Sequence, residues 1–88
     1  MDNYLTEWIG LSENQVEDIL ESLGFKHDSS ILSRDVYYKN KTITVCIITK
    51  EEFGKQYLQL FAEKGNKFKS LSIPYYASQI SQLITFEN

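Results

Sequence analysis

Four carboxylate side chains in one short segment are the first candidates for chemistry in this sequence. Glu13, Glu17 and Glu21 recur at intervals of four residues in SENQVEDILESLGF, and Asp18 lies beside them. In a helix this spacing places them along one side. A cation site, a docking surface and a solvated helix side could each use such a row. Calcium requires six or more oxygen ligands, usually from a flexible loop, so we predict no metal site here.

The charge is distributed unevenly along the chain. Residues 1–24 contain six acidic side chains and no Lys or Arg, whereas residues 25–88 contain nine basic and six acidic ones, for a net charge of −3. A surface of one sign accelerates encounter with a surface of the opposite sign. We therefore predict that the acidic side binds a basic surface on another protein. The alternative is that it is only solvated. The residues of the predicted surface are Glu13, Glu17, Asp18 and Glu21, with Trp8, Tyr37 and Tyr75 as aromatic anchors.

A single histidine and a single cysteine offer little further chemistry. His27 opens the segment HDSS, but neighbouring loop residues rarely converge on one reacting point. One His and one Cys also fall short of the four ligands of a zinc site. Cys46 is predicted to be a structural thiol opposite Asp35, whose negative charge would raise the pKa of the thiol. The sequence contains no phosphate-binding loop, dinucleotide fingerprint, nucleophile elbow or metalloprotease motif, so we expect neither an enzyme nor a cofactor.

The one basic cluster, KGNKFK, supports an alternative function. Lysines around an aromatic side chain could hold phosphates and stack a base. The nucleic-acid-binding residues would then be Lys64, Lys67, Phe68 and Lys69. A further alternative is a structural homodimer, formed through an exposed patch of Tyr37, Cys46 and Ile48 on the outer face of a sheet.

The acidic segment carries the local signals of a helix. Ser12 and Gln15 form a capping box. Gly24 supplies the stop, after which Phe25 can fold back on Leu20. Apolar residues recur with helical period at Val16, Ile19, Leu20 and Leu23. The segment is therefore predicted to form one amphipathic helix, with its acidic side next to its apolar stripe.

A β-hairpin is predicted in the middle of the chain. ILSRDVYY and TITVCIIT alternate apolar and polar residues and flank KNK. A turn at Asn40-Lys41 would pair Tyr38 with Ile43 and Val36 with Val45, which gathers the apolar residues on one face. HDSS at 27–30 is predicted as a loop and KFKSLSI as a short strand.

The stretch TKEEFGKQYLQLFAEKG fits two structures. Thr49 and Glu52 make a second capping box, and Gly65 is placed to end a helix. Gly54, by contrast, costs a helix about 1 kcal/mol relative to Ala. We predict a helix, with a strand from Lys55 to Ala62 as the alternative. The helical pattern comes from Phe53, Tyr57, Leu60 and Phe61.

Two further helices are predicted at the ends of the chain. The first is a short helix over residues Asp2–Ile9. The second begins with Pro74 in its first turn and has an apolar stripe at Tyr76, Ile80, Leu83 and Ile84. Because Tyr76 belongs to this stripe, Tyr75 is expected to be the more exposed of the two tyrosines.

These elements predict a single α+β domain over residues 1–88. It has two layers, in which helices cover one face of an antiparallel sheet of three strands. The element order is α-α-β-β-α-β-α, or α-α-β-β-β-β-α with four strands if the strand alternative holds.

Location and class follow from what the sequence lacks. MDNYLTEW has no signal-peptide character, no apolar run is long enough to span a membrane, and one cysteine fits a reducing compartment. We therefore expect a cytoplasmic protein that binds another protein. Immunity proteins, antitoxins and phage-type inhibitors are of this physical kind, being small, acidic on one side and free of catalytic motifs.

Overall fold

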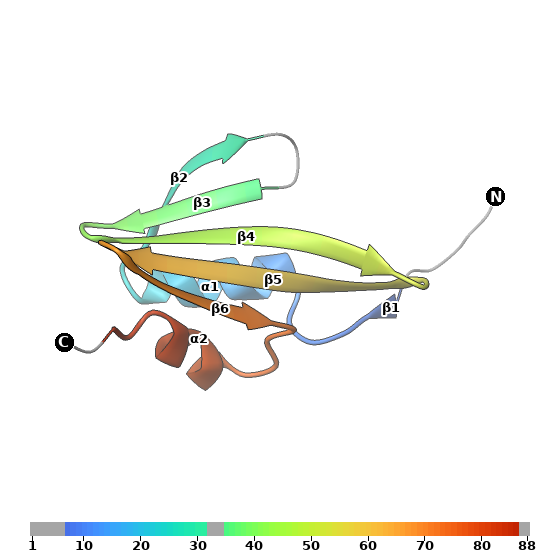
Figure 1. The fold of residues 1–88 in the computed structure, drawn as a ribbon. Helices are drawn as coiled ribbons and strands as arrows, with labels where there is room; N and C mark the ends of the chain where they lie inside the picture. The colour runs from blue at the N-terminus through green and yellow to red at the C-terminus, as the bar shows by residue number, and fades with distance from the viewer. Residues whose placement is uncertain (1–6, 32–34, 87–88) are drawn as a thin grey trace.

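A sheet with two helices on one face forms the part of the chain that the structure describes, residues 7–31 and 35–86 of a computed structural model (Figure 1). Side-chain positions are described outside residues 29–31 and 35–37. The expected α+β class is confirmed, but the sheet is larger than expected and is mixed. In chain order the elements are β1 (Glu7–Trp8), α1 (Glu13–Ser22), β2 (Lys26–Ile31), β3 (Asp35–Asn40), β4 (Ile43–Glu52), β5 (Lys55–Lys64), β6 (Lys67–Ser72) and α2 (Ala77–Leu83).

A long β4–β5 hairpin is the axis of the sheet. The strands lie in the order β1-β5-β4-β3-β2, and β6 also pairs with β5. Since β4 occupies one edge of β5 along its whole length, β1 and β6 share the other edge. The β1–β5 pair is parallel and the remaining pairs are antiparallel. Sequential hairpins therefore build most of the sheet, and β1 is added to it from the N-terminal side.

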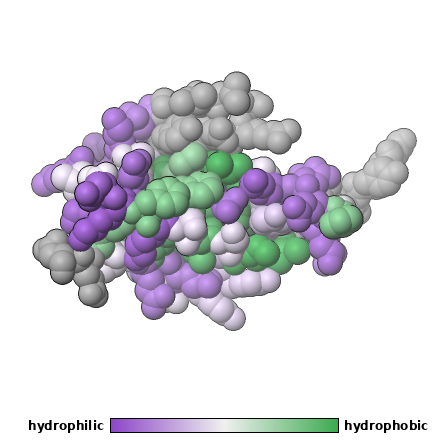
Figure 2. All heavy atoms as spheres, viewed as in Figure 1, coloured by the Kyte–Doolittle hydropathy of each residue, from purple (hydrophilic) through white to green (hydrophobic). Residues whose placement is uncertain are grey.

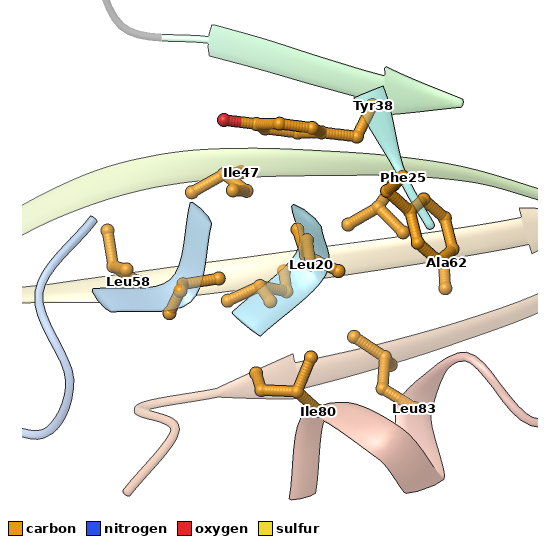
Figure 3. Close-up of a cluster of buried hydrophobic side chains, with 11 residues drawn as sticks. Leu20, Phe25, Tyr38, Ile47, Leu58, Ala62, Ile80 and Leu83 are labelled. Carbon is orange, nitrogen blue, oxygen red and sulfur yellow. The ribbon is translucent and has the colours of Figure 1, made fainter. Parts of the chain in front are cut away.

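The hydrophobic core lies between the sheet and the two helices (Figure 3). Alternate residues of β4 and β5 point into it, as the period of two in a strand requires. Val16 and Leu20 of α1 and Ile80 and Leu83 of α2 close it from the other side. The buried side chains are Val16, Leu20, Phe25, Tyr38, Val45, Ile47, Leu58, Leu60, Ala62, Ile80 and Leu83.

The predicted caps of α1 are confirmed. The Ser12 N–H donates to Gln15 Oε1 at 2.9 Å, and the Gln15 N–H donates to Ser12 Oγ at 3.4 Å. Gly24 has a left-handed φ of 97°. The Phe25 N–H then reaches back to the carbonyl oxygen of Leu20 at 3.0 Å, which closes a Schellman motif. Local sequence alone is enough to begin and end this helix.

The β3–β4 hairpin forms with a register two residues away from the predicted one. Asn40 pairs with Ile43 and Tyr38 with Val45, so the turn is Lys41-Thr42. A shift of two keeps every side chain on its predicted face. The shift also places Cys46 opposite Tyr37 and not opposite Asp35 as predicted.

The helix predicted for residues 50–64 is wrong, and the strand alternative is correct. Phe53 and Gly54 form a tight turn, and β5 then pairs with β4 on one side and with β1 and β6 on the other. Leu58 and Leu60 are both buried, as the strand alternative requires. Pairing on both edges stabilises a strand that the local helical stripe disfavours, because strand preference depends on context. Gly65, predicted as a helix stop, lies in the β5–β6 turn.

Three boundaries near the ends of elements also differ from prediction. In the predicted N-terminal helix, residues 2–6 lie outside the described residues, while Glu7–Trp8 forms a strand. HDSS belongs to edge strand β2, which accepts polar residues because it pairs on one side and carries a bulge between His27 and Ser29. The last helix begins at Ala77 and not at Pro74. The Pro74 carbonyl accepts the Leu11 N–H at 2.7 Å, which holds this segment against the chain before α1.

Candidate functional site

The acidic row of α1 is exposed along its C-terminal half. Glu13 and Glu17 are half-buried, whereas Asp18 and Glu21 are exposed. The row runs beside the buried stripe of Val16 and Leu20. Glu13 lies in the first turn, where the helix dipole favours an acid, and Glu21 lies near the opposite end, where it does not. The last turn of the helix contains no basic residue.

Tyr38 of β3 contacts the middle of this row. Its side chain lies over the same core as Leu20 and Ile47 (Figure 3), and its hydroxyl hydrogen-bonds the Glu17 carboxylate. The pKa of Tyr38 is raised, first by burial and then by that hydrogen bond and by the charges of Glu17, Glu21 and Glu13. The acidic side of α1 therefore faces the β3 side of the sheet, and Glu17 has a structural contact that the sequence did not indicate.

Glu13 and Glu17 form a second close contact. The pKa of Glu13 is raised above 4.5 by burial, by the charge of Glu17 and by a hydrogen bond between the two side chains. Two carboxyl groups can share a hydrogen bond only when one of them is protonated. The charge of Glu17 therefore opposes ionisation of Glu13, and a cation from outside would relieve this repulsion.

No described Lys or Arg neutralises the acidic row. On the neighbouring hairpin Lys39 Nζ lies 3.7 Å from Asp28 Oδ2, while the carboxylates of α1 have no such ion pair among the described side chains. Within residues 7–31 and 35–86, no cluster of three His, Cys, Asp or Glu side chains is arranged to hold a metal ion. The acidic row therefore presents a negative electrostatic potential to solvent.

The predicted aromatic anchors do not surround the acidic row. Trp8, with 41% of its surface exposed, lies in β1, and Tyr75, 51% exposed, follows β6. Both belong to the β1/β6 edge of the sheet, whereas the acidic row faces β3. Tyr37 pairs with Cys46 in the β3–β4 ladder, but its side chain lies outside the described side chains. The predicted composite surface is thus divided between two sides of the molecule.

Tyr76 corrects the expected order of exposure. It is 68% exposed, more than Tyr75, and was predicted to be in the core. The reason is that the helix begins at Ala77, so Tyr76 is an N-cap residue with extended backbone. The backbone N–H groups of Tyr75 and Tyr76 both donate to Gln79 Oε1, at 2.7 and 3.0 Å.

The three lysines of the basic cluster lie on one face of the β5–β6 hairpin, the face that the helices cover. Lys69 points toward α2, where its Nζ donates to the carbonyl oxygens of Gln82 at 2.6 Å and Thr85 at 2.8 Å. The same Nζ lies 5.3 Å from the centre of the Phe86 ring. Lys69 therefore stabilises the C-terminal end of α2. Lys64 pairs with Lys67 across the turn of this hairpin.

Phe68 lies on the opposite face of β6 from Lys69. It is 62% exposed and stacks on Phe61 at 5.6 Å between ring centres. The alternation of KFKSLS is the signal that separates the two side chains, since neighbouring residues of a strand point to opposite faces. The structure therefore does not bring Lys69 and Phe68 together as one nucleic-acid site.

His27 and Cys46 occupy strands. His27 lies opposite Tyr38 in the β2–β3 ladder, and the two rings meet edge to face at 5.7 Å. Cys46 is half-buried in β4, on the face away from Val45 and Ile47. His27 therefore contacts the buried tyrosine that also binds Glu17, a relation that the sequence did not indicate.

Sequence reasoning missed the most exposed large apolar side chain among those that the structure describes. Phe53 is 98% exposed and occupies the turn of the β4–β5 hairpin. It was predicted to be the first residue of a helical stripe. The dipeptide Phe-Gly between two alternating segments was the signal that could have found it, because a two-residue turn ending in Gly is typical of a hairpin.

No protein-family model matches the sequence, and neither the curated proteins nor the solved structures contain a significant match to it. Neither of the helices in residues 7–31 and 35–86 has the length and apolar character needed to cross a bilayer.

Proposed function

We propose that this chain is a small protein-binding protein of the inhibitor, immunity or antitoxin kind, acting in the cytoplasm. The acidic side of α1 docks on a basic surface of another protein. The proposal assigns the chain no catalytic step. The observation that supports it is a row of like charges that the fold retains without a basic partner among the described residues.

Charge repulsion within α1 favours a binding role for its acidic residues over a role in stabilising the fold. Like charges four residues apart destabilise a helix by a few tenths of a kcal/mol per pair. Glu21 adds an unfavourable interaction with the helix dipole. Local features that cost stability without a compensating contact are expected at functional sites. Asp18 and Glu21 meet this description, because both are exposed and neither is tied to the core.

Glu13 and Glu17 have a supporting role in this proposal. Glu17 is held by the Tyr38 hydroxyl, and Glu13 lies half-buried beside Glu17. These two residues keep the negative field next to β3, while Asp18 and Glu21 remain open for direct contact. A partner with Lys or Arg side chains at matching spacing would gain encounter rate and specificity from the whole row.

The matched test compares two double variants with the same change in charge. The tagged protein is used to capture partners from its native host, and a captured partner is then purified and titrated. Asp18→Asn with Glu21→Gln should raise the dissociation constant about tenfold, since each exposed pair is worth about 0.2–1 kcal/mol. Glu51→Gln with Glu63→Gln, exposed acids on β4 and β5, should leave it unchanged.

Salt and stability provide two further measurements. Binding by the wild-type protein should weaken as ionic strength rises, because the interaction is between exposed charges. The Asp18→Asn, Glu21→Gln variant should unfold at the same or a slightly higher temperature, since repulsion is relieved. A partner that binds both double variants as tightly as the wild type would contradict the proposal.

The nucleic-acid alternative has less structural support. Lys69 already donates hydrogen bonds to carbonyl oxygens at the end of α2, and Phe68 lies on the other face of β6. Lys64 and Lys67 flank the turn of the hairpin, and two lysines are a small charge for holding a phosphate backbone. Retention on heparin that is lost in a Lys64→Glu, Lys67→Glu variant would favour this alternative over the acidic docking surface.

A further inference from the structure

Phe53 is disfavoured in the monomer for two independent reasons. It forms the turn between the paired residues Glu52 and Lys55, with a left-handed φ of 51°. That conformation is unfavourable for a residue with a bulky side chain, and Asn, Asp or Gly usually occupies it. Because the side chain is 98% exposed, it also gains no burial energy on folding. Folding of the single chain therefore does not explain an aromatic side chain at this position.

A pocket of about 360 Å³ lies beside this turn. Ile9, Tyr57 and Ile73 form its apolar walls, and Phe53 lines its edge. Ile73 also has a left-handed φ, of 54°, which is a rare conformation for a β-branched residue. Backbone strain of this kind persists where the surrounding structure imposes it, and it gathers at binding sites. Of the non-glycine residues with positive φ in the described chain, which are Lys41, Phe53 and Ile73, two line this pocket.

The pocket opens on the face of the sheet opposite the helices. Tyr57 alternates with the buried Leu58 along β5, so it points away from the core. Figure 2 shows this outer face, with an apolar band over the middle of the sheet and hydrophilic side chains toward both ends.

We propose that Phe53 of one molecule inserts into the Ile9–Tyr57–Ile73 pocket of a second copy of this chain, which returns its own Phe53 in the same way. The exposed Phe53 ring and the apolar pocket lie together at one end of the molecule, but Phe53 does not fill its own pocket. A two-fold axis between two copies fills both pockets with one arrangement, as isologous dimers require. The long β4–β5 hairpin places this turn at one end of the molecule, clear of both helices (Figure 1).

The charges around the turn also favour a second copy over a strongly charged partner. Glu52 and Lys55 flank Phe53 and Gly54, and both contribute to the rim of the pocket. Each copy thus presents one acid and one base, and a two-fold arrangement can place each opposite its complement. A lipid surface is less well matched, because Glu51 and Glu52 would approach anionic headgroups together with the ring.

This association leaves the acidic side of α1 open. The acidic row faces β3 on the helix side of the sheet, whereas the pocket lies at the β1/β6 edge on the outer face. A dimer formed through Phe53 would therefore present two acidic surfaces. The inference does not depend on the proposed function, and a failure of either leaves the other intact.

The test measures molar mass by light scattering and by sedimentation over a range of protein concentrations. The wild-type protein should shift from a mass of 10.3 kDa toward twice that value as concentration rises. Phe53→Asn should raise the dissociation constant about a hundredfold, because it removes a central aromatic contact twice in each dimer. The same variant should fold at least as stably as a monomer, since Asn tolerates a left-handed backbone.

A matched control separates this contact from general aromatic exposure. Tyr76→Asn removes another exposed ring, at a position where Asn is a good N-cap, and should leave the dimer unchanged. Ile73→Asn changes a wall of the pocket and should weaken the dimer without changing Phe53. A wild-type protein that stays monomeric at millimolar concentration would overturn the proposal. So would a dimer that survives Phe53→Asn, which would point to another surface.

Discussion

The hydroxyl of Tyr38 donates a hydrogen bond to the carboxylate of Glu17, which joins strand β3 to the acidic side of α1. Tyr38 is 1% exposed, so this polar group lies at the boundary between the core and the acidic row. The contact accounts for one carboxylate that the caps and the apolar stripe of α1 do not require. It leaves Asp18 and Glu21 as the members of the row without a described structural contact.

Replacing Tyr38 by Phe should remove this contact with little change in packing volume. We expect the free energy of unfolding at pH 7 to fall by about 1 kcal/mol, because Glu17 loses a donor but remains partly solvated. Urea denaturation measures the change. Tyr75→Phe is the control, since Tyr75 is 51% exposed and should change little. Equal effects of the two variants would mean that the hydrogen bond contributes nothing to stability.

The pKa of Glu13 should lie above 4.5 in the folded protein and fall toward that value in Glu17→Gln. That variant removes two causes of the shift, a negative charge and a shared hydrogen bond, and leaves burial. Because a raised pKa means that the folded chain binds the proton more tightly than the unfolded chain, this group adds stability as pH falls from 7 toward 4.5. NMR titration of the side-chain carboxyl gives the pKa. Glu21→Gln should leave it unchanged, since Glu21 is not among its causes.

Local chemistry predicted α1 completely, but the other elements depended on long-range pairing. Ser12, Gln15 and Gly24 each act within a few residues of one another, so the sequence contains the whole argument for that helix. The segment around Tyr57 and Leu60 fits a helical stripe as well as an alternating strand. Pairing of β5 with strands on both edges selects the strand, and single-sequence patterns do not contain that information.

The candidate site was predictable in charge but not in position. The count of acids before Gly24 indicated a row on α1, and the row is present. Its contact with Tyr38 required the sheet order, which places β3 beyond β4 and next to the acidic side of the helix. The same order moves Trp8 to the distant β1 edge. Phe53 was missed because a turn residue in a hairpin was assigned to a helix.

The end of α2 should depend on Lys69. Its ammonium group donates to the carbonyl oxygens of Gln82 and Thr85 at the end of this helix, and the Gln82 oxygen also accepts the Thr85 N–H at 3.2 Å. Lys69→Met should lower the free energy of unfolding by about 1–2 kcal/mol, in line with hydrogen bonds from a charged donor. Hydrogen exchange at Ile80 and Leu83 should become faster as the helix frays. Lys50→Met, an exposed lysine on β4, is the control, and an equal loss there would show that only surface charge matters.

Gly10 lies in the connection between β1 and α1, where the backbone packs against Pro74. A Cβ at Gly10 would lie 2.4 Å from the Pro74 carbonyl oxygen, and its φ is 81°. Gly54 has a similar φ of 75° but no atom within 4 Å of the equivalent position. Gly54→Ala therefore measures the backbone strain alone, about 1 kcal/mol, and Gly10→Ala measures strain plus the collision with the backbone.

We expect Gly10→Ala to cost at least about 1 kcal/mol more than Gly54→Ala in thermal or urea unfolding, because the backbone of Pro74 must move and the bond from the Leu11 N–H to its carbonyl weakens. The difference between the two variants is the measured quantity, since it cancels the shared conformational term. If the two alanine variants lose the same stability, the contact between this link and the β6–α2 connection does not hold the N-terminal strand in place.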